Sequence, residues 1–212
     1  IDDNVQNHQL MLLHGAQGKG KSTFIRHLLP PELKDYYRNG MIIPENNNHL
    51  LQLSSCLLIN LDEFDTLSPE RMQNLKSLIT QDVVNERKVY DIQNYTYIRR
   101  ASFIASTNNP HCMPDVKENR RILFSTLLNI DYHTPVNHEG IYAQAYALYR
   151  QGFQYWYENE EITFLNNRNE AFRQKDPIEE NLFFYFRAAR QNDIQAQWYP
   201  ASYLLSVLSM NG

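Results

Sequence analysis

Residues 15–22 read Gly15-Ala16-Gln17-Gly18-Lys19-Gly20-Lys21-Ser22 and match the phosphate-binding pattern G-x-x-x-x-G-K-[ST]. The apolar run before them, at residues 10–13, predicts a buried strand, and residues 23–29 after them predict a helix that ends at Pro30-Pro31. The three glycines let the loop turn its N–H groups toward a phosphate chain. Strand, loop and helix in this order predict a nucleotide site; the alternative is a glycine-rich turn that binds nothing.

The pattern assigns a role to each reactive side chain of this loop. The Lys21 ammonium would reach the β- and γ-phosphates of ATP, and the Ser22 hydroxyl would ligate Mg²⁺. The residues expected to contact the nucleotide are Gly15, Ala16, Gln17, Gly18, Lys19, Gly20, Lys21, Ser22 and Thr23.

A second signal lies at residues 56–63, where an apolar run ends in Asp62 and Glu63. Such a run predicts a buried parallel strand with carboxylates at its carboxyl end. Asp62 would hold the Mg²⁺ through its water shell, and Glu63 would polarise the water that attacks the γ-phosphate. The alternative is a solvated acidic turn before a helix.

The elements that follow come in a defined order. Ser68 is the expected N-cap of a helix whose apolar face includes Met72, Leu75, Leu78 and Ile79. Residues 88–92 and 95–98 predict a hairpin that turns at Gln93-Asn94.

Two further polar signals accompany the last predicted strands. Residues 102–110 predict a strand ending near Asn108, which would orient the attacking water or touch the γ-phosphate, although such an Asn is also a common turn former. Arg120 and Arg121 precede a strand predicted at residues 122–124. They are either a solvated surface or an arginine finger that stabilises charge on the transferred phosphoryl group.

Composition limits the class of protein. The 212 residues, 42% hydrophobic and 21% charged, predict one globular domain with an appendage. No apolar run approaches the roughly 20 residues that span a bilayer, so we expect a cytoplasmic protein without membrane contact. The net charge of −4 argues against a broad basic face, so any nucleic-acid contact must be local or built by several subunits. The spacing of Cys56 and Cys112 disfavours a disulfide framework and a zinc site.

The last third of the chain changes character. From Glu139 onward helical patterns carry many aromatic residues, whose spacing of three and four favours a helix packed on the core over a platform for single-stranded bases. Further helices are expected after Asp176-Pro177 and after Pro200. We therefore expect an ATPase core at residues 1–138 and a helical, truncated C-terminal extension at residues 139–212.

This order of motifs resembles the compact ATPase core of superfamily 3 helicases. Residues 75–80, 87–90, 100–108 and 119–121 are most similar to the virulence-associated protein E family of phage and mobile-element proteins, and the resemblance covers roughly residues 8–175. It implies an α/β P-loop NTPase fold of the AAA+ type, with a parallel sheet flanked by helices and an α-helical C-terminal extension. It also implies a ring of identical subunits, six in number, with ATP and Mg²⁺ at the interfaces.

The resemblance assigns Lys21 and Ser22 to the phosphate loop, Asp62 and Glu63 to the metal and the water, and Asn108 to the sensor position. Arg120 or Arg121 would be a finger supplied to the neighbouring subunit. In that superfamily the hairpin before the sensor strand carries basic residues to DNA. The cations nearest to the predicted turn here are Arg87, Lys88, Arg99 and Arg100.

Three functions follow as hypotheses. The first is an ATP-hydrolysing helicase or translocase that moves on single- or double-stranded DNA in the replication of a phage or mobile element. The second is a nucleotide-dependent assembly or recruitment module without translocation. A small-molecule kinase is disfavoured, because the sequence shows no arginine-rich lid.

Overall fold

The computed structural model describes residues 7–42, 47–61, 64, 67–87, 94–113, 119–174, 177–190 and 193–211. The chain divides into two compact units, Ile1–Arg173 and Gln174–Gly212. Within the described ranges, no helix is both long enough and apolar enough to cross a membrane.

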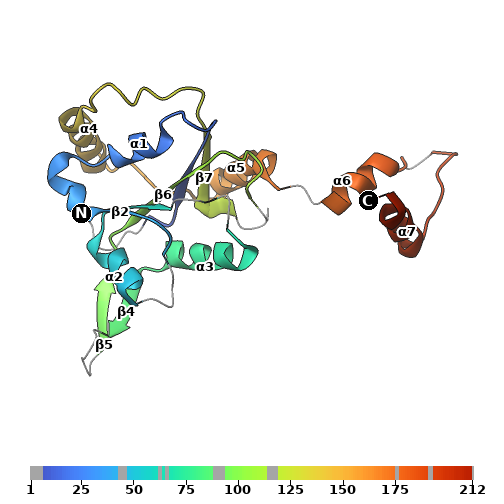
Figure 1. Cartoon of the computed structure of the whole chain (residues 1–212), viewed down its shortest axis with the longest axis horizontal. Helices are drawn as coiled ribbons and strands as arrows, with labels where there is room; N and C mark the ends of the chain where they lie inside the picture. The colour runs from blue at the N-terminus through green and yellow to red at the C-terminus, as the bar shows by residue number, and fades with distance from the viewer. Residues whose placement is uncertain are drawn as a thin grey trace. The chain divides into compact units, whose positions relative to one another are not determined.

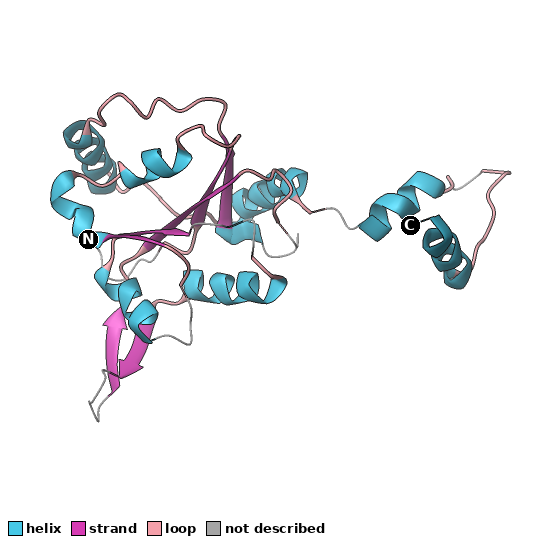
Figure 2. Ribbon diagram, in the orientation of Figure 1, coloured by secondary structure: helices cyan, strands magenta, loops and turns pink. Residues whose placement is uncertain are grey.

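Five parallel strands form the centre of the first unit, in the order β2-β3-β6-β1-β7 (Figures 1 and 2). Their bounds are β1 Leu10–His14, β2 Tyr37–Asn39, β3 Leu58–Leu61, β6 Ser102–Thr107 and β7 Ile122–Thr126. The strands predicted around β1, β3, β6 and β7 are confirmed, and β2 was not anticipated. Because every pair is parallel, the carboxyl ends of the strands meet at one edge of the sheet.

Helices pack on both faces of this sheet (Figure 1). The helices and 3-10 turns of the first unit are α1 Lys21–Arg26, η1 Pro31–Tyr36, α2 Asn47–Ser55, α3 Pro69–Thr80, η3 Asn119–Arg121, α4 His138–Arg150, α5 Asn159–Asn169 and η4 Glu170–Phe172. On one face Leu13 and Ile104 pack against Ile25 of α1. On the other face a larger cluster joins the sheet to α2 and α3. Alternation of side chains along each strand produces these two layers.

Helix α3 confirms its prediction from sequence. The Ser68 side chain accepts a hydrogen bond of 3.3 Å from the Arg71 amide, which caps the helix. The four residues of its expected apolar face are all buried, namely Met72, Leu75, Leu78 and Ile79.

The hairpin exists, but its register differs from the prediction. Strand β4, Val83–Arg87, pairs antiparallel with β5, Asn94–Ile98, and Arg87 lies opposite Asn94. The turn expected at Gln93-Asn94 is therefore wrong, because Asn94 belongs to the ladder. The first strand begins at Val83, and Val84 is fully buried in the core. Residues 88–93, including Lys88, lie outside the described part of the chain.

Helix α4 contradicts the packing expected from its aromatic spacing. It buries no side chain, and Tyr142, Tyr146 and Tyr149 are 43%, 61% and 44% exposed. The helix is held near the segment that follows α1, because the Tyr142 hydroxyl donates to the Leu28 carbonyl oxygen at 3.4 Å. Trp156 and Tyr157, also expected on a helix, lie in the connection between α4 and α5. Aromatic periodicity does not identify which helix faces the core, since tyrosine tolerates exposure.

Helix α5 and η4 complete the first unit beside β7. Asn169 is buried, and its side-chain amide donates to the Ile122 carbonyl oxygen at 2.8 Å. The Phe172 ring stacks on Phe124 with a centroid separation of 3.6 Å. Helices α4 and α5, which sequence analysis assigns to the extension, thus belong to the same compact unit as the sheet.

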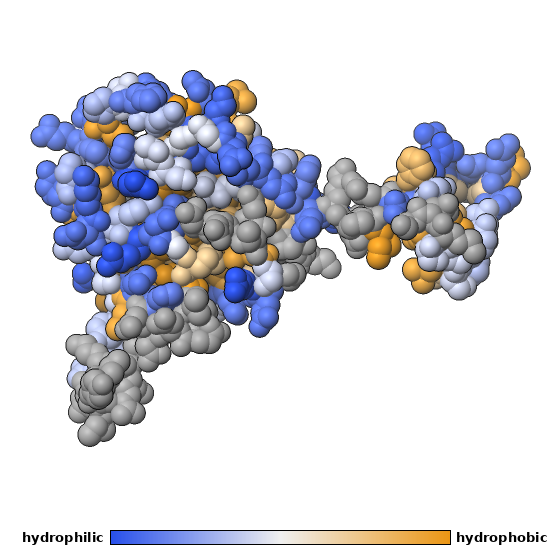
Figure 3. All heavy atoms as spheres, viewed as in Figure 1, coloured by the Kyte–Doolittle hydropathy of each residue, from blue (hydrophilic) through white to orange (hydrophobic). Residues whose placement is uncertain are grey.

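The second unit contains α6, Pro177–Tyr185, and α7, Ala201–Asn211. Both helices agree with the elements expected after Pro177 and Pro200. Large hydrophobic side chains remain exposed on this unit, among them Phe184 and Trp198, and Figure 3 shows orange residues on its surface.

Candidate functional site

The loop between β1 and α1 closes around the ammonium of Lys21. The Lys21 side chain is 7% exposed, and its Nζ donates to the carbonyl oxygens of Gly15 at 2.5 Å and Ala16 at 2.9 Å. A third bond of 2.8 Å runs to Oδ1 of Asn108. An ammonium has three hydrogens to donate, and burying one without partners is costly. Here these three contacts fix the positive charge at the mouth of the loop.

Backbone geometry makes this wrapping possible. Gly18 and Gly20 have φ of 78° and 80°, a conformation that costs other residues free energy. Helix α1 begins at Lys21, directly after Gly20. Ser22 and Thr23 are exposed on its first turn, as are Ala16, Gln17 and Lys19 in the loop.

Strand β6 aligns Asn108 with this loop. The Gly15 amide donates to the Thr107 carbonyl oxygen at 3.3 Å, so the end of β6 continues alongside the start of the loop. Thr107 is 1% exposed, and its hydroxyl accepts a hydrogen bond from the Asn109 amide at 3.0 Å. The structure therefore brings together Lys21 and Asn108, two predicted site residues 87 positions apart.

The predicted metal and water residues, Asp62 and Glu63, lie outside the described residues. Strand β3 ends at Leu61, directly before them in the sequence, and pairs with β6 with Leu61 opposite Ala105. Their roles in holding Mg²⁺ and activating water stay predictions. Ser22, the other predicted metal ligand, has an exposed side chain on α1.

Arg120 and Arg121 lie at the opposite edge of the sheet from the loop. They end η3, directly before Ile122, which pairs with Leu10 at the start of β1. The loop begins after His14, at the other end of the same strand. At about 3.3 Å per residue the five positions from Leu10 to Gly15 span about 17 Å, farther than an arginine side chain extends. Neither arginine can therefore contact the loop of its own chain.

The arginine pair lines a cleft of about 510 Å³. The His8 imidazole and the Asp82 carboxylate are hydrogen-bonded at 2.6 Å on its wall. Tyr155 and Trp156 form another wall, with their rings edge to face at 5.1 Å. The predicted arginine finger would therefore act from this cleft rather than from the Gly15–Ser22 loop of its own chain.

One of the cations assigned to the hairpin has a different role. Arg99 is 3% exposed, and its guanidinium donates to the carbonyl oxygens of Gln81 at 2.7 Å, Ala101 at 2.5 Å and Asn7 at 2.8 Å. Burial lowers the pKa of Arg99, and the charge of Asp82 opposes that shift. Arg99 therefore ties the base of the hairpin to the first unit, whereas Arg100 is exposed.

Sequence reasoning missed Tyr132, whose ring lies against the loop. A Cβ placed on Gly20 would be 2.0 Å from Cδ1 of that ring. The turn beneath it is fixed by the Asp131 carboxylate, which accepts from the His133 and Thr134 amides at 3.0 and 3.1 Å. Hydrogen bonds lower the pKa of Asp131. The largest effect comes from the Thr134 hydroxyl, and smaller effects come from the Thr134 and His133 amides. No motif identifies Tyr132, because its contact depends on where the chain returns after β7.

Comparison with known proteins gives one family match and several structural likenesses. Three solved apo structures of the C-terminal region of NrS-1 are similar to this chain, with TM-scores of 0.44, 0.41 and 0.43 and identities of 16%, 18% and 17%. They cover 81%, 80% and 79% of this chain, which spans only 35%, 36% and 36% of theirs. No curated protein sequence shows significant similarity.

The family comparison covers most of the first unit. The sequence profile of the virulence-associated protein E-like domain matches residues 3–174, a range that includes the loop, the sheet and the arginine pair. The chain therefore belongs to the virulence-associated protein E-like domain family.

Proposed function

We propose that this chain is the ATP-binding and ATP-hydrolysing domain of a superfamily 3-like DNA helicase or translocase that acts in the replication of a phage or mobile element. The observation that supports it most is the Lys21 ammonium, which is held by Gly15, Ala16 and Asn108 at the carboxyl edge of a parallel sheet. Ligands of open α/β sheets bind at that edge. The fold would be that of an AAA+-type P-loop NTPase.

Each of the predicted site residues would have a distinct role in ATP binding and hydrolysis. The Gly15–Ser22 loop and Lys21 would bind the β- and γ-phosphates of ATP, and the exposed Ser22 hydroxyl would ligate Mg²⁺ together with Asp62. Glu63 would take the proton of the attacking water. Asn108, already within hydrogen-bond reach of Lys21, would contact the γ-phosphate or that water. Mg²⁺ supplies charge stabilisation on the phosphate oxygens.

The position of the arginine pair supports a ring. Arg120 and Arg121 cannot reach the loop of their own chain across the length of β1, so a finger from this pair must act on a neighbouring subunit. A head-to-tail interface of this kind closes into a ring, which we propose to be a hexamer.

A decisive experiment measures ATP hydrolysis against protein concentration, with and without single-stranded DNA. A ring-forming motor predicts a rate per subunit that rises steeply with concentration and rises again with DNA. Glu63→Gln should retain ATP binding and lose hydrolysis. A rate per subunit that is constant with concentration and unaffected by DNA would refute the motor.

Mixing two inactive variants tests whether the arginine acts in trans. Lys21→Ala removes the loop lysine, and Arg120→Ala and Arg121→Ala, made separately, each remove a candidate finger. In mixed rings roughly a quarter of head-to-tail interfaces would join an intact loop to an intact arginine. Mixing Lys21→Ala with the arginine variant that lacks the finger should restore hydrolysis. If neither arginine variant recovers hydrolysis when mixed with Lys21→Ala, a finger supplied by the neighbouring subunit is refuted.

One observation favours the second candidate, a nucleotide-dependent assembly module. Helix α4 exposes Tyr142, Tyr146 and Tyr149 and buries none of its side chains, which leaves an aromatic surface for another protein. ATP binding with slow turnover indifferent to DNA would select this function over the motor.

A further inference from the structure

A second pocket lies in the first unit at the end of α1 that is remote from the Gly15–Ser22 loop. It encloses about 780 Å³ between α1, η1, β2 and the segment that precedes α4. One wall is closed by the His138 imidazole, whose Nε2 lies 2.8 Å from the His27 carbonyl oxygen. No motif found in the sequence accounts for this pocket.

Among the described residues, the lining of the pocket includes several cations and no carboxylate. Arg26, Lys34 and Arg38 contribute three positive charges, and His27 and His138 add two imidazoles. Glu32 and Asp35 lie on the same turn, η1, but neither lines the pocket. In a chain with a net charge of −4, such a local excess of positive charge favours a polyanionic ligand.

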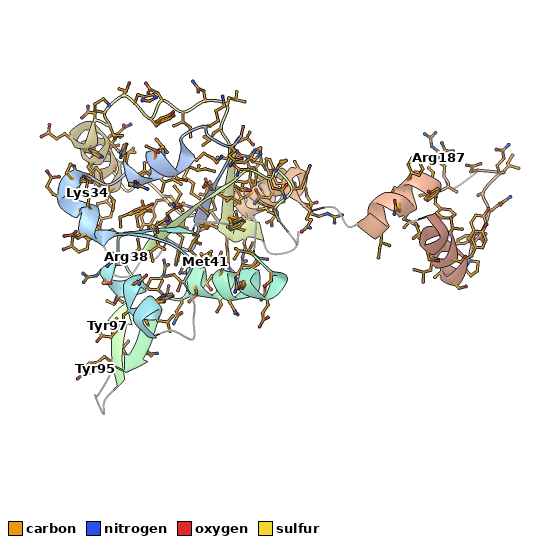
Figure 4. The ribbon with its side chains drawn as sticks, in the orientation of Figure 1. Lys34, Arg38, Met41, Tyr95, Tyr97 and Arg187 are labelled. Atoms are coloured by element: carbon orange, nitrogen blue, oxygen red, sulfur yellow. The ribbon has the colours of Figure 1, made fainter. Side chains whose placement is uncertain are left out.

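The three cations are available to a ligand. All three are exposed, and within the described ranges none of their side chains forms an ion pair or a hydrogen bond. Figure 4 shows that Lys34 and Arg38 come from adjoining elements, η1 and β2, at one margin of the first unit. Half-buried Tyr37 is part of the same lining and contributes an aromatic side chain, the kind on which bases of single strands stack.

The pocket lies at the same edge of the sheet as the base of the hairpin. The Leu57 amide donates to the Tyr36 carbonyl oxygen, and the Ser102 amide donates to the Leu57 carbonyl oxygen, both at 2.9 Å. Strand β3 lies between β2 and β6, so the start of β2 is two strand spacings, about 10 Å, from the start of β6. Residues 99–101, which join β5 to β6, lie at this edge. Arg100, two residues before Ser102, is exposed. It is the exposed cation that lies between the pocket edge of the sheet and the hairpin in the described sequence.

We propose that this pocket binds the phosphodiester backbone of a single-stranded nucleic acid, with Arg26, Lys34 and Arg38 on the phosphates and Tyr37 beside a base. The inference deepens the function proposed above by locating its nucleic-acid contact. The size of the pocket favours a single strand, because a cube of 780 Å³ is about 9 Å on a side and the major groove of a duplex alone is about 12 Å wide. Such a cationic pocket would also give a chain with a net charge of −4 a local contact with DNA.

The test measures binding of a fluorescein-labelled 20-nucleotide oligothymidylate by anisotropy, without ATP, at several salt concentrations. The triple variant Arg26→Gln, Lys34→Gln, Arg38→Gln removes the three pocket cations. For single strands, each phosphate contact contributes about 0.7 to the steepness with which the logarithm of the binding constant falls with the logarithm of salt concentration. The triple variant should therefore reduce this steepness by about 2. It should also weaken binding at 0.1 M salt by about 100-fold. A matched control, Arg150→Gln, Arg168→Gln, Arg187→Gln, removes the same charge from exposed positions outside the pocket.

The proposal requires loss in the pocket variant and near wild-type binding in the control. Equal losses in both variants, no loss in the pocket variant, tighter binding of a duplex, or no binding by the wild-type chain would each overturn it. Circular dichroism and ATP affinity of the pocket variant should equal those of the wild type, since no residue of the Gly15–Ser22 loop lines the pocket. Lys21→Ala, tested for ATP binding without DNA, reports separately on the nucleotide site.

Discussion

Asn108→Asp is the sharpest single perturbation of the proposed nucleotide site, because it adds one negative charge with little change in size. The Asn108 Oδ1 atom lies 2.8 Å from the Lys21 Nζ atom, so the new carboxylate would pair with the ammonium that is proposed to bind phosphate. A phosphate oxygen bound to the same ammonium at about 2.8 Å would lie no more than about 5.6 Å from the carboxylate oxygen.

The expected magnitude follows from that separation. Two unit negative charges about 5.6 Å apart repel by about 3 kcal/mol at an effective dielectric constant of about 20. A free-energy penalty of this size weakens ATP binding about 100-fold. The unliganded protein should not be destabilised, because the carboxylate gains an ion pair with Lys21.

Isothermal titration calorimetry with MgATP measures the first effect, and thermal unfolding measures the second. Asn108→Ala is the control, because it removes the hydrogen bond without adding charge and should weaken ATP binding by about tenfold or less. The electrostatic account would be refuted by wild-type affinity in Asn108→Asp, or by an equal loss in the alanine variant.

Two further predictions concern the loop and the cysteines. Gly20→Ala should lower the free energy of unfolding in urea by more than Gly18→Ala, because both have positive φ but only at Gly20 would the Cβ collide with Tyr132. Equal losses in the two variants would show that the ring does not constrain the loop. A disulfide reagent should modify half-buried Cys112 in the native protein and Cys56 only after unfolding, since burial raises the pKa of the Cys56 thiol. Rapid native modification of both thiols, counted by absorbance, would contradict this packing.

Local signals were sufficient for β1, β3, β6 and β7 and for helix α3. The apolar runs around Leu12, Ile59 and Phe103 lie in buried strands, because such runs are stable only inside a covered sheet. Helix α3 followed from its N-cap and apolar spacing. Strand β2, Tyr37–Asn39, is only three residues long. It pairs with β3 because the fold brings the two segments together, and its residues alone do not identify it as a strand.

The site could be predicted in part. Lys21 and Asn108 follow from motif order, and their contact follows from adjacent parallel strands that share a carboxyl edge. Tyr132 could not be predicted, because its contact with Gly20 is long-range and has no sequence signature. The three carbonyl acceptors of Arg99 could not be predicted for the same reason, since only the fold brings them together.

The central claim is that the Lys21 ammonium is the anchor of an ATP phosphate chain. The most direct measurement is the affinity of the wild-type chain and of Lys21→Met for MgATP by isothermal titration calorimetry. Methionine keeps the buried aliphatic stem and removes the charge, which should cost about 1.5–3 kcal/mol and weaken binding by roughly 10- to 150-fold. Equal affinities for both proteins, or no ATP binding by the wild-type chain, would contradict the account.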